Sequence, residues 1–225
     1  MSPLKLPFGL RDGRLYEPRH VDAGLACRCV CPSCGEALIA KHGDSGKIRP
    51  HFAHAAGAAC DAGFESAVHL AAKQLIEERR ELFFPEHRCH VQHRAGSQWL
   101  EAHEVLEDAG VKDVRDIEVE KAVGRLRPDL TVRVADRRYI IEIAFTHFVD
   151  DDKLQRLRVQ GDPALEFDVS DLRVLDFALL EERLFTRSAR VKWLYHPETA
   201  ACESRLRVQL EPQIARAQQA YAAAQ

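Results

Sequence analysis

The spacing of apolar residues along this chain of 225 residues follows two different periods. Between Glu65 and Arg80, apolar side chains recur at positions 68, 71, 72, 75 and 76, which predicts a helix with one apolar face. Short extended runs on both sides of Asp12-Gly13 predict a hairpin, because this dipeptide suits a two-residue turn. Three further runs have the alternation and composition of strands, and they cover residues 114–120, 130–134 and 138–145.

The second half of the chain also alternates helices and strands. Three acids open the segment 150–159 and basic residues follow them, which predicts a short helix. Beyond it we expect a strand at 164–169, a helix at 172–185, an extended run at 191–195 and a helix from residue 198 onward. Residues 81–110 stay open between strand and helix, apart from an extended run at 89–93 and a turn at 95–97. The predicted order in the middle is helix, three strands, helix, strand, and the predicted class is mixed α/β (α+β).

Composition and charge narrow the classes of function. Hydrophobic residues make up 46% of the chain, enough to bury a core, and no apolar run approaches the roughly 18 residues of a membrane span. The first residues lack the layout of a signal peptide, so we expect a cytoplasmic protein with no membrane partner. Lys and Arg number 32 against 35 Asp and Glu, a net charge of -3. Any contact with nucleic acid must therefore come from a local basic patch.

A cluster of cysteines and histidines near the start of the chain predicts a metal site. Five of the seven cysteines lie in the first 60 residues, and Cys31 and Cys34 have the two-residue spacing of a zinc-binding pair. We favour Cys31, Cys34, His54 and Cys60 as ligands, with His51 as a substitute for one of them. In an extended segment, residues three apart face opposite sides, so both histidines are not expected to bind together. The alternative is a set of reduced buried cysteines and exposed histidines.

Two carboxylates in the β-rich part predict a second metal site. Asp129 opens one predicted strand, and Glu142 lies in the next, within an otherwise nearly apolar run. A buried carboxylate is costly unless it is paired or bound to a cation, and Mg²⁺ and Mn²⁺ prefer oxygen ligands. The alternative is a structural ion pair between Glu142 and Arg127 or Arg138.

The predicted helix at 65–80 carries three polar residues spaced by four. Glu65, His69 and Lys73 therefore share one face, which would meet the carboxylates if the helix packs beside them. A solvated face is the alternative explanation for this stripe.

These features resemble the competence protein CoiA-like family, which consists of predicted nucleases with a zinc-ribbon-like amino-terminal segment and a restriction-endonuclease-like PD-(D/E)XK core. The resemblance spans roughly residues 24 to 170. Its matching stretches are Cys31-Pro32-Ser33-Cys34-Gly35, His51-Phe52-Ala53-His54, Cys60, Glu65-Ser66 with His69 and Lys73, Arg127-Pro128-Asp129, Ile141-Glu142-Ile143 with Thr146-His147, Asp151-Asp152-Lys153-Leu154, and Glu166-Phe167-Asp168-Val169-Ser170.

The resemblance implies that Asp129 and Glu142 bind a catalytic Mg²⁺ or Mn²⁺ and that Glu65 supports this ion from the helix. The chain departs from the family pattern at Ala144, where a lysine is expected two residues after the acid. Lys153 is our first candidate to supply the missing amine and Lys73 the second, because a long side chain can reach the sheet from a neighbouring helix. Both could instead be solvated lysines.

Two functions are therefore in competition. The first is a metal-dependent DNA nuclease with a structural zinc module at 1–62, a nuclease core at 63–190 and a helical extension at 191–225. Phosphate contacts would come from a group of arginines near the acids, which otherwise serve solubility: Arg125, Arg127, Arg133, Arg137 and Arg138. The second is a protein with an impaired nuclease fold that binds DNA or a partner without cutting, as the loss of lysine at Ala144 suggests.

Overall fold

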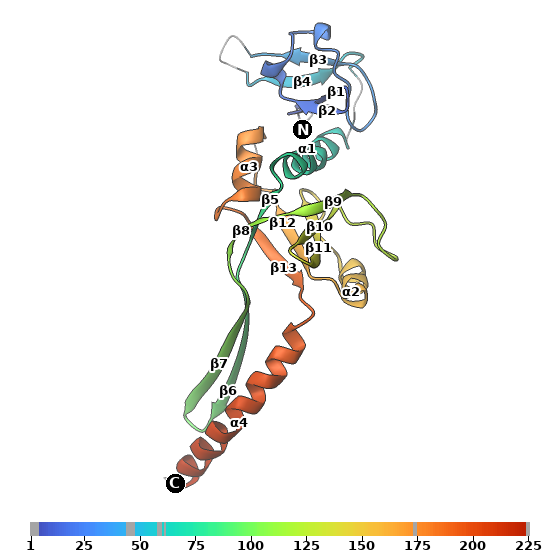
Figure 1. The fold of residues 1–225 in the computed structure, drawn as a ribbon. Coiled ribbons are helices and arrows are strands. Elements are labelled where there is room, and N and C mark those ends of the chain that lie inside the picture. The colour runs from blue at the N-terminus through green and yellow to red at the C-terminus, as the bar shows by residue number, and fades with distance from the viewer. Residues whose placement is uncertain (1–4, 44–47, 58–59, 61, 173–174, 224–225) are drawn as a thin grey trace.

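The computed structural model describes residues 5–43, 48–57, 60, 62–172 and 175–223. Three regions follow one another along the long axis of the molecule (Figure 1). An amino-terminal module lies at one end, a sheet with flanking helices lies in the middle, and a hairpin with the last helix extends to the other end. The mixed α/β class predicted from the sequence is confirmed.

The amino-terminal module contains two small antiparallel hairpins. Asp12 and Gly13 both adopt positive φ angles of 51° and 78°, so they form the predicted tight turn of the first hairpin. The second hairpin carries His51 and His54 on its later strand. The elements of the module are β1 Gly9–Arg11, β2 Arg14–Tyr16, the 3-10 helices η1 Pro18–His20 and η2 Leu25–Cys27, β3 Leu38–Lys41 and β4 His51–His54.

The central sheet has five strands in the order β13-β12-β11-β10-β9. Only β11 and β12 are parallel, and Glu142 on β11 is in register with Glu166 on β12. The strands are β9 Arg115–Val119, β10 Leu130–Val134, β11 Arg137–Ala144, β12 Ala164–Asp168 and β13 Val191–Tyr195. The predicted domain boundary at residue 191 falls at the first residue of β13, although β13 is hydrogen-bonded to β12 of the central sheet. Helix α4, Thr199–Ala223, forms the extension beyond β13.

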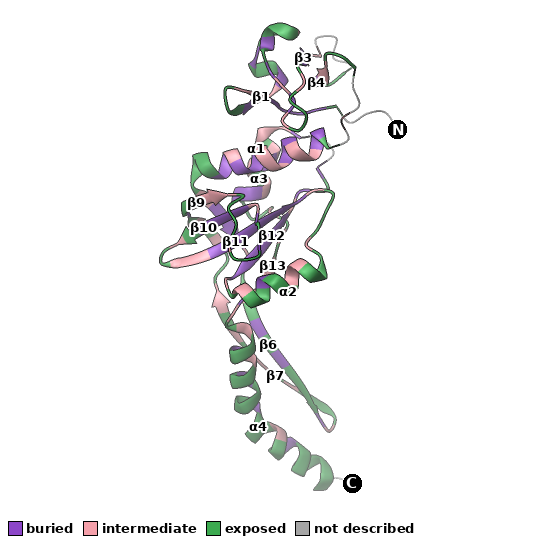
Figure 2. Cartoon of the chain, turned by 90° about the vertical axis from the view of Figure 1, so that its right-hand side faces the viewer, coloured by how far each residue is buried: buried purple, intermediate pink, exposed green. Residues whose placement is uncertain are grey.

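Helix α1, Gly63–Arg79, lies between the module and the sheet (Figures 1 and 2). Its five predicted apolar positions are all buried, as the periodicity required. The other side of the helix contacts the module, where Gln74 accepts a hydrogen bond from the amide of Leu15 at 2.7 Å. The helix thus has a neighbour on each side, and its polar residues are not all solvated.

Two shorter helices complete the core. Asp150 caps α2, Asp151–Gln160, by accepting a hydrogen bond from the amide of Lys153, as the acidic start predicted. Helix α3, Phe177–Phe185, begins later than the predicted residue 172 because Asp176 is the capping residue.

The segment that the sequence left open forms four strands. They are β5 Glu81–Phe84, β6 His87–Ala95, β7 Gln98–Glu107 and β8 Gly110–Asp113. The long hairpin of β6 and β7 packs against α4, and we call these three elements the arm. Its small core joins Cys89 and Val91 to Cys202, Leu206 and Leu210. Most of the other residues of the arm are exposed (Figure 2).

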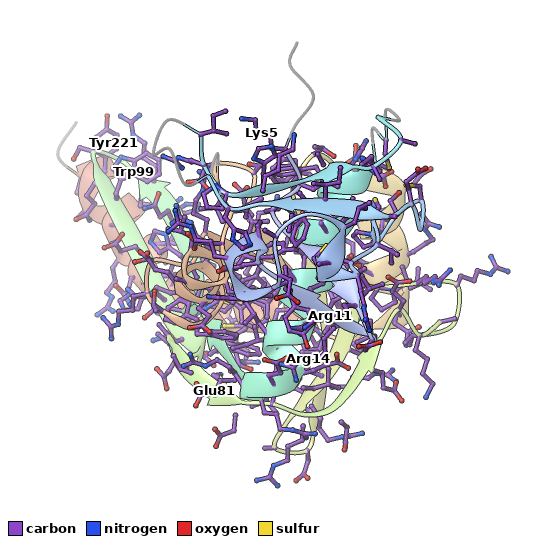
Figure 3. The ribbon with its side chains drawn as sticks, turned by 90° about the horizontal axis from the view of Figure 1, so that it is seen from above. Lys5, Arg11, Arg14, Glu81, Trp99 and Tyr221 are labelled. Atoms are coloured by element: carbon purple, nitrogen blue, oxygen red, sulfur yellow. The ribbon has the colours of Figure 1, made fainter. Side chains whose placement is uncertain are left out.

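The far end of the arm carries two exposed aromatic residues. Trp99 and Tyr221 lie at the same edge of the molecule (Figure 3), and the Tyr221 ring packs directly over Gly96 in the hairpin turn. Across all the described residues, no helix combines the length and the apolar character needed to cross a bilayer.

Candidate functional site

Asp129 lies just before β10 and is fixed on three sides. Its Oδ2 accepts a hydrogen bond from the amide of Ile143 at 2.9 Å. Its Oδ1 lies 3.2 Å from His69 Nδ1 and 3.0 Å from Lys73 Nζ. Burial alone would raise the pKa of Asp129, but His69, Lys73 and the Ile143 amide outweigh it and hold that pKa well below its usual range. An ionised carboxylate is therefore held against the backbone of β11, next to Glu142.

Glu142 points into the protein from the middle of β11, with its side chain only 5% exposed. Its Oε2 accepts a hydrogen bond from Lys153 Nζ at 2.7 Å. Its Oε1 is buried and has no hydrogen-bond partner among the described residues. Burial, together with the nearby charge of Asp129, raises the pKa of Glu142 to about 7 despite the attraction of Lys153.

Lys153 reaches Glu142 from the first turn of α2. Ala144, where the family pattern has a lysine, is buried on β11 and offers no amine. The predicted alternative partners of Glu142 are engaged elsewhere, since Arg127 pairs with Glu120 and Arg138 pairs with Asp162. The structure therefore places our first candidate lysine beside the second acid.

Lys73, our second candidate, lies at the first acid instead. It is almost fully buried on α1, and its Nζ is 2.8 Å from Glu120 Oε1 as well as 3.0 Å from Asp129 Oδ1. Each of the two predicted metal-binding acids thus has its own lysine, one from α1 and one from α2.

Glu65 and His69 lie on the same face of α1 as Lys73, as their spacing predicted. His69 Nε2 is 3.8 Å from Glu65 Oε1, and this nitrogen is buried without a hydrogen-bond partner among the described residues. Glu65 also contacts the loop after β11, where Thr146 donates to Oε2 and His147 Nδ1 is 3.2 Å from Oε1. Burial opposes these contacts, but they lower the pKa of Glu65 below its usual value.

Asp129 and the polar residues of α1 line an open cleft of about 350 Å³, whereas Glu142 and Lys153 are not among its lining residues. Pro32 of the amino-terminal module forms part of its wall, so the module and the core both contribute to it. Its polar lining consists of Glu65, Ser66, His69, Lys73, Glu120 and Asp129. The cleft can admit a phosphate group and a hydrated cation, and it is edged by carboxylates that could bind that cation.

The arginines predicted to contact phosphates lie in two different places. Arg125 and Arg127 are exposed in the loop between β9 and β10, and Arg127 pairs with Glu120, which lines the cleft. Arg133 lies four residues after Asp129, about 13 Å away by the rise of a strand, and pairs with Asp116. Of these three arginines, Arg127 is the one that contacts a residue of the cleft.

Sequence reasoning missed two acids near this site. Glu166 is 1% exposed on β12, beside Glu142 in register, and its Oε1 lies 2.6 Å from Lys192 Nζ. A similar signal to the one that identified Glu142, an acid within a mostly apolar strand, was present here, although Asp168 also lies on β12. The sequence around Glu120 carries no comparable signal, because Glu120 pairs with Lys73, which lies on α1 and meets it only in the folded protein.

The four favoured ligands in the amino-terminal module lie together. The ligand atoms of Cys31, Cys34, His54 and Cys60 are all within 4.8 Å of one another. Cys31 Sγ and Cys60 Sγ are 3.9 Å apart, close to the roughly 3.8 Å that two bonds of about 2.3 Å impose in a tetrahedral zinc site. Burial raises the pKa of Cys31 to about 11, so a cation is needed to hold its thiolate at neutral pH. The cluster can bind a metal ion, and its donors and spacing are those that zinc prefers.

The remaining cysteines and histidine of the module have other contacts. His51, our substitute ligand, is buried with Nδ1 2.9 Å from the carbonyl of Arg49. Cys27 and Cys29 are buried thiols that donate to the carbonyls of Leu38 and Cys27. None of the three belongs to the four-residue cluster.

Comparison with known proteins bears on the module that holds this cluster. Searches of curated proteins and of solved structures each found no match. A family model, however, covers the segment that contains all four clustered ligands and ends at the first residue of α1. Residues 25–63 match the amino-terminal domain of competence protein CoiA.

Proposed function

We propose that this protein is a divalent-metal-dependent nuclease that hydrolyses phosphodiester bonds of DNA, with a structural zinc ion in its amino-terminal module. The observation that carries the proposal is the pairing of Glu142 with Lys153 at 2.7 Å beside the fixed carboxylate of Asp129. This arrangement supplies from α2 the amine that Ala144 lacks. The fold order of α1, β9, β10, β11, α2 and β12, interrupted only by β5 to β8, is the order expected of such a core.

The donor atoms fit a hard cation. Glu142 Oε1 is a buried carboxylate oxygen without a partner among the described residues, and such an atom is costly unless something binds it. Carboxylates of Asp129 and Glu142 are the ligands that Mg²⁺ and Mn²⁺ prefer. When bound, such an ion would polarise the scissile phosphate and lower the pKa of a water molecule.

The protein's own residues have separable roles in this scheme. The amide of Ile143 orients Asp129, and Lys153 lies where it can hydrogen-bond to an attacking water beside Glu142. Glu65 and His69 line the cleft from α1, where the Glu65 carboxylate would support the cation. Arg125 and Arg127, exposed next to the cleft, would bind phosphates and make the affinity fall with salt.

One observation favours the second candidate, a nuclease-fold protein that binds DNA or a partner without cutting. Lys73 and Lys153 already neutralise Asp129 and Glu142 through direct ion pairs, so the site needs no cation for charge balance. The unpartnered Glu142 Oε1 argues for the enzyme, because a site released from catalysis would be more stable with an apolar residue there.

The test incubates the purified chain with single- and double-stranded DNA, and with RNA, in Mn²⁺ or Mg²⁺. We expect Asp129→Asn, Glu142→Gln and Lys153→Met each to lower the cleavage rate by at least about 100-fold. Matched controls on exposed ion pairs are Glu104→Gln and Lys121→Met, which should cleave like the wild type. Equal cleavage by wild type and Glu142→Gln would point to a contaminant and refute the proposal. DNA binding without cleavage in either metal would establish the second candidate.

A further inference from the structure

Helix α1 begins directly on the cysteine and histidine cluster. Ala62, the residue before the helix, offers no side-chain cap for the first turn. The amide of Gly63 instead donates to the carbonyl of Cys60, one of the four clustered ligands, at 3.2 Å. A thiolate at this position also suits the positive end of the helix dipole. The backbone carbonyl of one clustered ligand thus accepts a hydrogen bond from the first amide of the helix, in the absence of a side-chain cap.

The contact at Gly63 is too close for any other residue to fit unchanged. A Cβ atom there would lie 3.1 Å from Cys60 Sγ and 3.3 Å from Cys31 Sγ. It would also lie 3.2 Å from a methyl group of Leu6. A single methyl group at position 63 would therefore require these neighbours, two of them ligand sulfurs, to move by a few tenths of an ångström.

The first turn of α1 also holds Glu65, two residues after this contact. Glu65 forms the link to Thr146 and His147 in the loop that follows Glu142. Pro32, which lies between the ligands Cys31 and Cys34, is part of the wall of the cleft that Glu65 lines. The ligand cluster therefore contacts the helical turn that carries Glu65, and the residue between two of its ligands forms part of the wall of the cleft.

We propose that the metal centre of Cys31, Cys34, His54 and Cys60 is a positioning element of the cleft, which sets the place of Glu65 relative to Asp129 and so the affinity of the cleft for its divalent cation. This inference rests on the proposed function, because it requires a cation in the cleft. It assigns the module a role beyond holding its own fold: ligand geometry at one end of the turn determines the carboxylate geometry at the other.

A second anchor of the same turn offers a competing explanation. The ring of Phe64 packs on that of Phe145, at the end of β11, with a centroid distance of 5.1 Å. If this packing and the Thr146 contact position Glu65 by themselves, changes at the ligand cluster will leave cation binding in the cleft unaltered.

Gly63→Ala separates the two explanations, because it keeps all four ligands and both aromatic rings. Gly110→Ala is the matched control, since a Cβ at Gly110 meets no atom within 4 Å. Each full-length protein is loaded with Co²⁺ in place of zinc, so that the visible thiolate and d-d bands report the ligand geometry. Mn²⁺ is then titrated and its free concentration measured by electron paramagnetic resonance.

We expect Gly63→Ala to bind one Co²⁺ with shifted visible bands and to raise the Kd for Mn²⁺ at least threefold, while Gly110→Ala changes neither. Shifted bands with an unchanged Kd would overturn the inference and leave the proposed function intact. If Gly63→Ala does not fold, Cys60→His, which keeps a metal donor but changes its reach, is judged by the same two measurements. Absence of Mn²⁺ binding by the wild type would refute the proposed function and this inference together.

Discussion

Replacing Lys153 by Met gives a quantitative test of the buried pair in the absence of divalent ions. Methionine keeps most of the stem but removes the amine that lies 2.7 Å from Glu142 Oε2. Lys153 is one of the groups that lower the pKa of Glu142, so its removal raises that pKa above its present value of about 7. The effect on stability therefore depends on pH in a way that can be worked out.

The sign follows from the difference between the folded and unfolded states. The folded pKa of Glu142 is about 7 against an ordinary 4.5, so this carboxyl stabilises the fold most below pH 4.5 and loses that contribution as the pH rises to 7. At about 1.4 kcal/mol per pH unit the wild type loses about 3 kcal/mol over this window and then levels off. In Lys153→Met the loss continues above pH 7, because the carboxyl remains protonated only in the folded state.

The expected difference between the two proteins is therefore about 1 kcal/mol or less near pH 6 and roughly 2 to 3 kcal/mol near pH 9. Urea unfolding followed by circular dichroism, with EDTA present, measures it across this range. Lys121→Met, at an exposed pair, should change the free energy of unfolding by less than about 1 kcal/mol at every pH. A Lys153→Met difference that is constant with pH would refute the charge coupling between Lys153 and Glu142.

Three further predictions concern other parts of the molecule. Tyr139→Phe removes a hydroxyl that donates to Glu107 at 2.7 Å, and should lower the free energy of unfolding in urea by about 1 to 3 kcal/mol; no change would show that the bond is not formed. Metal analysis should find one zinc ion per chain in the wild type and in Cys27→Ser. Cys34→Ser should lose the zinc ion and melt at a lower Tm. Loss of zinc from Cys27→Ser would refute the ligand set. Leu206→Ala leaves a void in the small core of the arm, so amide exchange should accelerate in β6, β7 and α4 but not in β11, whereas uniform acceleration would show that the arm and sheet unfold together.

Local sequence patterns were sufficient to predict the helices and strands that bury one regular face. The five apolar positions of α1 and the β-like composition of β10 and β11 predicted these elements within a few residues. The arm could not be predicted in the same way, because its hairpin exposes polar residues on most of its surface. Its few apolar residues are covered by α4, which lies roughly 100 residues later in the chain.

The site residues show the same division between local and long-range information. The expectation that only one of His51 and His54 binds followed from strand geometry alone, since residues three apart in β4 face opposite sides. The distribution of the lysines did not, because Lys73 and Lys153 reach different acids from different helices. Which amine reaches which carboxylate depends on helix packing, and no spacing along the chain contains that information.

The position of Lys153 shows how an amine that is absent at Ala144 can reach the buried acid from another element. Glu142 is buried, so its ionised form is costly unless a cation lies within a few ångströms of it, whichever element supplies that charge. Helix α2 forms the crossover between the parallel strands β11 and β12, and such a crossover places its helix over the sheet next to the strand it leaves. An amine in the first turn of that helix therefore returns to the strand end where Ala144 lacks one. The same requirement is met at Glu166, where Lys192 comes from β13, so in both parallel strands the buried acid, and not the local sequence, determines where a lysine is needed.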